Sequence, residues 1–127
     1  MKLIASILSA ALLLVGCGAP GQEADFRQIS QEEAAKLMET ESDYVILDVR
    51  TPEEFASGHI PGAINIPNET ISDAEPPQLP DRAQLILVYC RSGNRSKQAS
   101  RKLAALGYTN ILEFGGINTW PGEIVQD

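Results

Sequence analysis

The chain has few of the residues that build metal centres and disulfide frameworks. Its 127 residues include two cysteines, Cys17 and Cys90, and a single histidine, His59. This set is too small for a structural zinc site, so we expect no bound metal. The count permits one disulfide between the two cysteines, but the amino-terminal sequence favours a different modification of Cys17, which is described below.

An excess of basic residues is also missing. The formal net charge of −7 argues against nucleic acid as a partner and against a basic patch that binds anionic lipid. Between Asp81 and Glu113 the sign reverses, because this stretch has no acidic residue and six basic ones, Arg82, Arg91, Arg95, Lys97, Arg101 and Lys102. The basic stretch is centred on Cys90. Some of these residues fit an ordinary solvated helix face, whereas Arg91 and Arg95 are better placed to bind an anion.

No apolar run is long enough to span a bilayer. Residues 3–15 are apolar except for two serines, which is typical of a signal-peptide core. The run ends in Leu14-Val15-Gly16-Cys17, which resembles a bacterial lipobox. The resemblance implies a signal peptide at 1–16, an acylated Cys17 that begins a tether at 17–24, and one domain at 25–127. The alternative is a plain secretory signal that happens to end near a cysteine.

This interpretation also predicts where the protein resides. We expect an extracytoplasmic lipoprotein that is anchored to a membrane through Cys17 and faces the periplasm. Several acyl chains on one cysteine give a stable anchor, unlike a single chain. Gly18, in place of an aspartate, favours the outer membrane if the cell has one.

Strand patterns alternate with helix patterns along the rest of the chain. Ser30 with Glu33 and Thr51 with Glu54 are capping boxes that predict two helix starts. We expect strands near 26–29, 44–47, 63–66, 85–89 and 110–114, with helices near 31–39, 52–57 and 96–106. Residues 68–82 are expected to be a surface connection. This order predicts an α/β fold with a central parallel sheet of about five strands and helices on both faces.

Cys90 follows the most apolar of these strands and precedes a predicted helix. Ligands of open α/β sheets bind at the carboxyl ends of the strands. Backbone N–H groups at a helix start, the helix dipole, Arg91 and Arg95 all favour thiolate over thiol, so Cys90 is the expected nucleophile. The alternative is a buried structural thiol.

The sequence Cys90-Arg91-Ser92-Gly93-Asn94-Arg95-Ser96 resembles the active-site loop of the rhodanese family of sulfurtransferases. Residues 48–55, 58–67 and 115–120 match the family as well. The resemblance implies a three-layer α/β/α domain and a catalytic Cys90 that carries a persulfide. It implies a small anionic sulfur donor such as thiosulfate, a thiol or cyanide acceptor, and no cofactor. The substrate would be bound by the six loop residues Arg91, Ser92, Gly93, Asn94, Arg95 and Ser96.

Other residues near the predicted loop have supporting roles in this interpretation. Asp48 and Arg50 end a neighbouring strand, and we expect them to form a structural ion pair or to cap a helix, in either case supporting the loop. We expect His59 to make a hydrogen bond that stabilises its turn, and Trp120 to anchor the end of the chain in the core.

The sequence is also compatible with three other functions. A phosphatase or arsenate reductase would use the same thiolate, a thiol sensor would need no sulfur donor, and a binding module would keep only the fold. The spacing favours sulfur, because four residues separate Cys90 from Arg95, whereas the cysteine phosphatases that the loop otherwise resembles have five. A tighter ring of N–H groups suits a single sulfur atom better than a phosphoryl group.

Overall fold

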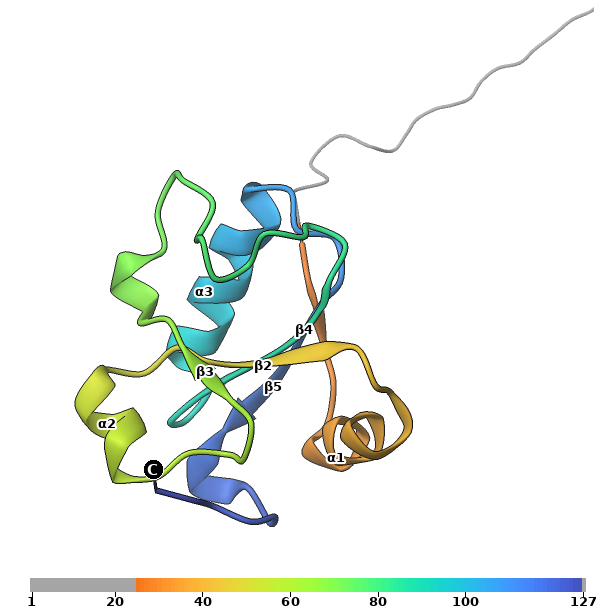
Figure 1. The fold of residues 1–127 in the computed structure, drawn as a ribbon, viewed down its shortest axis with the longest axis vertical. Helices are drawn as coiled ribbons and strands as arrows, with labels where there is room; N and C mark the ends of the chain where they lie inside the picture. Colours follow the sequence, from red (N-terminus) through yellow and green to blue (C-terminus); the bar gives the residue numbers. More distant parts are fainter. Residues whose placement is uncertain (1–24, 127) are drawn as a thin grey trace, which may run out of the picture.

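The computed structural model describes residues 25–126, and all five strands of this part of the chain run parallel in one sheet. The predicted signal peptide, the predicted lipidation site Cys17 and the predicted tether lie outside the described residues. The strand order is β1-β5-β4-β2-β3, which places β4 in the centre (Figure 1). The strands are β1 (Arg27–Gln28), β2 (Tyr44–Asp48), β3 (Ile64–Asn65), β4 (Leu85–Cys90) and β5 (Ile111–Gly116).

Helices cover both faces of the sheet, as the three-layer prediction requires. In Figure 1, α3 (Asn94–Ala105) lies on one side of the strands and α1 (Gln31–Thr40) on the other. The short helix α2 (Pro52–Ser57) follows β2. Two 3-10 turns complete the fold, η2 (Asn68–Thr70) after β3 and η3 (Ile117–Thr119) after β5. The expected α/β class and the number of strands are confirmed.

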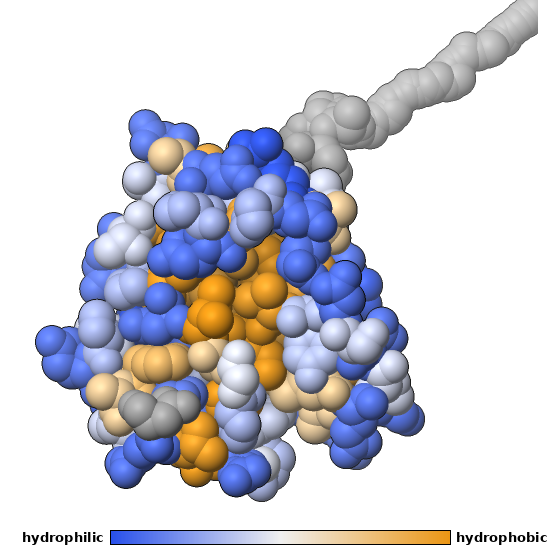
Figure 2. Space-filling view, in the orientation of Figure 1, coloured by the Kyte–Doolittle hydropathy of each residue, from blue (hydrophilic) through white to orange (hydrophobic). Residues whose placement is uncertain are grey.

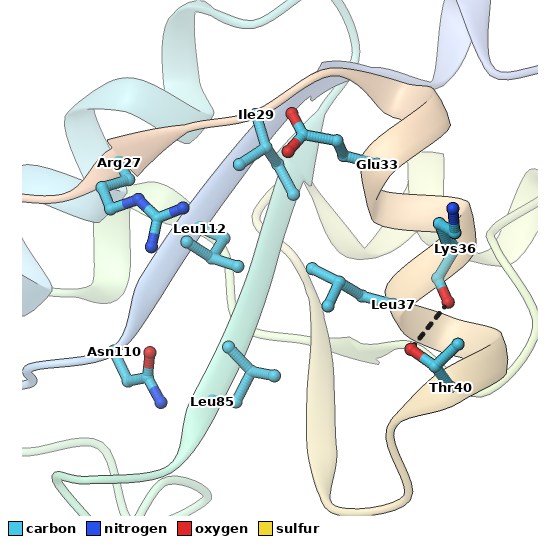
Figure 3. A pocket seen from close by; sticks show the side chains of 9 residues that line it. All are labelled: Arg27, Ile29, Glu33, Lys36, Leu37, Thr40, Leu85, Asn110 and Leu112. Atoms are coloured by element: carbon cyan, nitrogen blue, oxygen red, sulfur yellow. Dashed lines mark hydrogen bonds between the residues drawn. The ribbon is translucent and has the colours of Figure 1, made fainter.

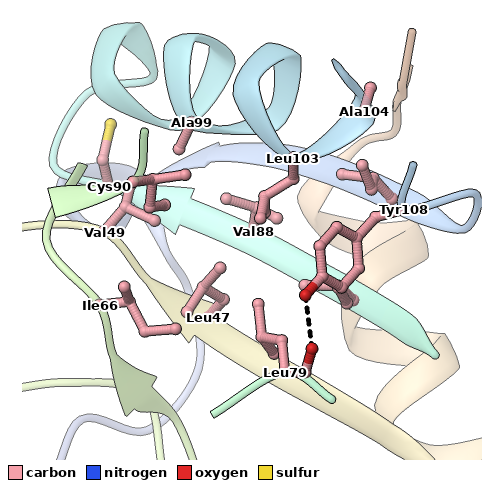
Figure 4. Packing of buried hydrophobic residues seen from close by; sticks show 13 residues of the cluster. Leu47, Val49, Ile66, Leu79, Val88, Cys90, Ala99, Leu103, Ala104 and Tyr108 are labelled. Atoms are coloured by element: carbon pink, nitrogen blue, oxygen red, sulfur yellow. Dashed lines mark hydrogen bonds between the residues drawn. The ribbon is translucent and has the colours of Figure 1, made fainter. Parts of the chain in front are cut away.

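Strand β4 supplies side chains to a separate hydrophobic cluster on each face. Ile86, Val88 and Cys90 point to the α3 face, while Leu87 and Tyr89 point to the α1 face. Successive side chains of a strand point to opposite faces, so a central strand that is apolar throughout can fill both cores. Figure 4 shows the Cys90 sulfur at the edge of the first cluster, beside the beginning of α3.

The predicted helix starts are present. Ser30 and Thr51 each accept a hydrogen bond from the backbone N–H of the glutamate three residues later, and each glutamate bonds back to the cap. Pro52 occupies the first helical position of α2. These reciprocal bonds satisfy backbone donors that a helix start leaves without partners. They fix where α1 and α2 begin, and α2 carries a residue of the candidate site.

The structure departs from the prediction in three features near the site and the core. Helix α3 begins at Asn94, two residues early, because Gly93 caps it in the left-handed conformation (φ 111°). The last strand, expected near 110–114, extends to Gly116, since Gly116 still pairs with Cys90. The connection at 68–82 is not wholly on the surface, because Ile71 and Leu79 are buried in the α3-side core.

The surface of the domain is mostly polar. Among the large hydrophobic side chains of residues 25–126, Ile124 is the exposed one. On the face shown in Figure 2, hydrophilic side chains surround a central area of apolar surface. A groove of about 390 Å³ lies between α1 and the start of the sheet, with Ile29, Leu37, Leu85 and Leu112 among its lining side chains (Figure 3). Within the described part of the chain, no helix has the length and apolar character needed to cross a membrane.

Candidate active site

The Cys90 sulfur lies where the sequence places it, at the carboxyl end of β4 and just before α3. Cys90 is a free cysteine with 1% of its surface exposed. The backbone N–H of Gly93 donates a hydrogen bond of 3.0 Å to the sulfur. Gly93 has a φ of 111°, a conformation that residues with a side chain rarely adopt, so glycine is required here. The turn therefore directs a fixed backbone dipole at the sulfur.

The end of β5 forms the floor of the loop. A Cβ atom added to Gly116 would lie 2.0 Å from the Arg91 carbonyl oxygen and 2.6 Å from the Cα of Ser92. The backbone N–H of Asn118 donates to the same carbonyl oxygen of Arg91 at 3.2 Å. The side chain of Gln31, on α1, donates to the Gly116 carbonyl at 2.8 Å. The loop is thus held in contact with β5, and only a residue without a side chain fits at position 116.

Inside the loop, Ser96 connects the sulfur to a carboxylate that the sequence analysis missed. The Ser96 hydroxyl is 3.4 Å from the Cys90 sulfur, which donates to it, and it donates in turn to the carboxylate of Glu113. Glu113 is 2% exposed and also accepts from the backbone N–H of Gly115 at 3.0 Å. A charged residue within the apolar run Ile111–Phe114 is the signal that could have identified it.

The other predicted loop residues separate into buried and exposed positions. Gly93 and Ser96 are buried, whereas Arg91, Ser92 and Asn94 are exposed and Arg95 is half-buried. The loop therefore presents one charged side chain, Arg91, directly to solvent. This placement suits contact with an anion that arrives from outside.

The guanidinium of Arg95 is bonded to a side chain of α2. It is therefore not a free cation beside the sulfur. Its two terminal nitrogens donate to the two carboxylate oxygens of Glu54 at 2.8 and 3.0 Å. Hydrogen bonds from Arg95 lower the pKa of Glu54 from 4.5 to about 2, and the same bonds raise the pKa of Arg95. The ion pair links the first turn of α3 to α2, a contact across 41 residues of sequence.

Comparison with known proteins agrees with this geometry. Residues 30–123 match the family described as the Rhodanese-like domain. The chain belongs to the rhodanese-like family. It is 38% identical over 71 residues to thiosulfate sulfurtransferase PspE of Escherichia coli, which covers 56% of this chain and 68% of that protein. It is 34% identical over 107 residues to thiosulfate sulfurtransferase GlpE of Pseudomonas entomophila, which covers 80% of this chain and 94% of GlpE.

A solved structure described as a rhodanese with anions from E. coli has a TM-score of 0.60 and 33% identity. The superposition covers 66% of this chain and 99% of that one. With these relatives, the chain is a rhodanese-type sulfurtransferase, an enzyme that transfers sulfur from a donor to a thiol acceptor. The expected family, fold and enzyme class are confirmed.

In this rhodanese-like domain a buried ion pair lies at the end of β2. Asp48 and Arg50 form the expected ion pair, with an Arg50 nitrogen 2.7 Å from a carboxylate oxygen of Asp48. Although burial opposes the charge, hydrogen bonding and attraction to Asp48 raise the pKa of Arg50. Burial, followed by the hydrogen bond to Asp48, raises the pKa of Tyr89. Because Asp48 pairs with Tyr89 in the sheet register, the buried pair lies beside the residue that precedes Cys90.

His59 and Trp120 have the structural roles that the sequence predicts. The His59 ring nitrogen Nδ1 is 2.9 Å from the Phe55 carbonyl oxygen, and the ring stacks on Phe55 with centroids 3.8 Å apart. Trp120 packs against Phe114 at the edge of the α1-side core. Among residues 25–126, no three His, Cys, Asp or Glu side chains cluster as metal ligands would.

Proposed function

We infer that this enzyme moves a sulfane sulfur from thiosulfate or a similar anionic donor to a thiol or cyanide through a persulfide on Cys90. The observation that carries this inference is the hydrogen bond from the Gly93 N–H to the Cys90 sulfur at the start of α3. A backbone donor and a helix amino terminus stabilise an anionic sulfur. The relatives named thiosulfate sulfurtransferase support the choice of donor.

The reaction has two displacement steps at sulfur. The Cys90 thiolate attacks the outer sulfur of thiosulfate, the bond between that sulfur and the sulfonate breaks, and sulfite leaves with the electron pair. Sulfite is a good leaving group, which thiolate attack on sulfur requires. An acceptor thiolate or cyanide then attacks the outer sulfur of the persulfide and releases the Cys90 thiolate.

Arg91 orients the donor in this proposal, and Arg95 holds the loop. The Arg91 side chain is exposed on the residue that follows Cys90, and an exposed guanidinium can form charge-assisted hydrogen bonds to a sulfonate. Arg95 is bonded through both terminal nitrogens to Glu54, so its charge serves the link between α2 and α3. A phosphatase or arsenate reductase needs donors directed at the oxygens of its substrate. The Arg95–Glu54 pair therefore argues for sulfur transfer over these rivals.

The assay compares two substrates on one preparation. Thiosulfate with cyanide should give thiocyanate and sulfite, and Cys90→Ser should abolish both products. An aryl phosphate should not be hydrolysed. Hydrolysis of the aryl phosphate without thiocyanate formation would replace the proposal with the phosphatase. If Cys90 reacts with oxidants or nitrosothiols and neither substrate is turned over, the thiol sensor becomes the better account.

The proposal places the enzyme on a membrane, outside the cytoplasm. It rests on the lipobox-like Leu14-Val15-Gly16-Cys17, which lies outside the described residues. Detergent phase partitioning tests it: the wild type should enter the detergent phase and Cys17→Ser should remain in the aqueous phase. Aqueous partitioning of both proteins, with the same amino terminus, would contradict the lipid anchor.

A further inference from the structure

Glu113 is a buried acidic side chain on β5, the strand next to the central β4, and the sulfur chemistry described above does not use it. Its carboxylate is 2% exposed, and among residues 25–126 no basic side chain lies within ion-pair distance of it. Burial of a carboxylate without a cation is costly, and buried charges are normally paired. Two donors contact its Oε2 atom, the Ser96 hydroxyl and the Gly115 N–H. Glu113 therefore depends on Ser96 for much of its stabilisation.

Ser96 joins this carboxylate to the reacting sulfur. A hydroxyl has one proton to donate and can also accept hydrogen bonds. The Cys90 thiol donates to the Ser96 oxygen at 3.4 Å. Three acceptors surround the Ser96 hydroxyl, the carbonyl oxygens of Gly93 at 3.0 Å and Gly115 at 3.5 Å and the carboxylate of Glu113, and the carboxylate is the nearest of them. A charged acceptor forms the stronger hydrogen bond, so the Ser96 proton is directed to Glu113. The hydrogen bonds thus run in one direction, from the sulfur through Ser96 to Glu113. A carboxylate at the end of such a chain can accept a proton when the thiol at its beginning loses one.

We propose that Glu113 stores the proton of Cys90 during the cycle, with Ser96 as the relay. The proposal rests on the sulfur transfer described above. When Cys90 ionises, the thiol proton passes to the Ser96 oxygen while the Ser96 proton passes to Glu113. The products are a thiolate and a neutral carboxylic acid, so the net charge of the buried group of atoms does not change.

The relay accounts for a buried acid beside a sulfur that must become anionic. A carboxylate and a thiolate together in a dry site would repel each other, and protonation of Glu113 removes that repulsion. In the second step, the electron pair of the breaking S–S bond returns to the Cys90 sulfur. The stored proton then moves back through Ser96, which restores the thiol and the carboxylate. Glu113 touches no substrate, so it is a positioning residue for the proton.

Other charged and polar groups lie on the elements around the loop. Arg91 lies on the loop, and Arg95 of α3 is bonded to Glu54 of α2, whose lowered pKa keeps it ionised to about pH 2. The Lys97 ammonium lies near Gly93, about 4.0 Å from where a Cβ on that glycine would be. Asp48, Arg50 and Tyr89 belong to the end of β2 and to the α1-side face of β4. From α1, the neutral side chain of Gln31 contacts the end of β5. Glu113 is the acidic group that reaches the sulfur through a hydrogen bond.

The test measures Cys90 reactivity without any sulfur donor. The full-length protein is treated with iodoacetamide from acid to alkaline pH, and the alkylated Cys90 peptide is quantified by mass spectrometry. Two coupled groups release their protons in two steps, so the wild-type rate should rise in two steps. Glu113→Gln, which has nearly the same shape but no proton site, should give one step. Glu123→Gln makes the same exchange at an exposed glutamate near the end of the described residues and should retain both steps.

Turnover provides a second readout. Loss of a positioned proton acceptor typically costs about 100-fold or more in rate, so Glu113→Gln and Ser96→Ala should lower kcat by that order with little change in KM. A single-step profile in the wild type would overturn the relay, whether or not the variants fold. Two steps in folded Glu113→Gln would overturn it too. If the wild type shows two steps but transfers no sulfur from thiosulfate, the relay stands and the proposed donor fails.

Discussion

Substitution of Gly116 by alanine should displace the active-site loop, because Gly116 lies against the loop backbone. The new Cβ would lie 2.0 Å from the Arg91 oxygen and 2.4 Å from its carbonyl carbon, whereas ordinary contacts are 3.4–4 Å. Both partners are backbone atoms, so the loop itself must retreat by more than 1 Å. Such a displacement of a reacting group can cost about 100-fold in rate. Overpacking of this kind also lowers the free energy of unfolding by about 1–3 kcal/mol.

Steady-state sulfur transfer and urea unfolding separate the two effects. Gly62→Ala is the matched control, because Gly62 has a φ of 85° but nothing within 4 Å of an added Cβ. Its left-handed conformation should cost about 1 kcal/mol of stability and leave kcat unchanged. Under conditions in which urea unfolding shows that Gly116→Ala is still folded, its kcat should be far below that of the wild type. Wild-type kcat in folded Gly116→Ala would refute the claim that β5 positions the loop.

Three further predictions follow from the ion pairs and the exposed arginine. Glu54→Gln keeps the helix cap but loses the charge, so it should lower stability at neutral pH by about 1 kcal/mol. The pKa of Glu54 is depressed from 4.5 to about 2, so the ion pair contributes its full stabilisation above pH 4.5 and loses it as the pH falls toward 2. The acid unfolding curves of wild type and variant should therefore converge near pH 2. Asp48→Asn leaves the buried Arg50 cation without its charged partner and should lower the free energy of unfolding in urea by about 3–5 kcal/mol. The double variant Asp48→Asn with Arg50→Met should recover part of that free energy. Arg91→Ala should raise KM for thiosulfate several-fold with little effect on stability, and an unchanged KM would remove Arg91 from the donor site.

The fold could be predicted because local and global signals agree. The capping boxes at Ser30 and Thr51 determine helix starts through contacts three residues apart. The apolar run of β4 is long enough to fill both cores, which identifies it as the central strand. The position of Cys90 then follows from the strand before it and the helical spacing after it. These features depend on neighbours in the sequence, so the sequence is sufficient to predict them.

The parts of the site that were missed depend on contacts between distant residues. The direction of Arg95 is decided by Glu54, which is 41 residues away on another helix. The need for glycine at position 116 comes from the backbone of the loop that it contacts, which local sequence does not reveal. Glu113 had a local signal, a charge inside an apolar strand, but its connection to Ser96 depends on how β5 and α3 pack.

The most direct test of the central claim is the intact mass of the protein after treatment with thiosulfate and removal of excess reagent. We expect the wild type to gain the mass of one sulfur atom, which is lost again when cyanide is added. Cys90→Ser should gain nothing, and protein alkylated at Cys90 beforehand should also gain nothing. A wild-type mass that thiosulfate leaves unchanged, in protein whose Cys90 is reduced and reacts with iodoacetamide, would contradict sulfur transfer from thiosulfate through a Cys90 persulfide.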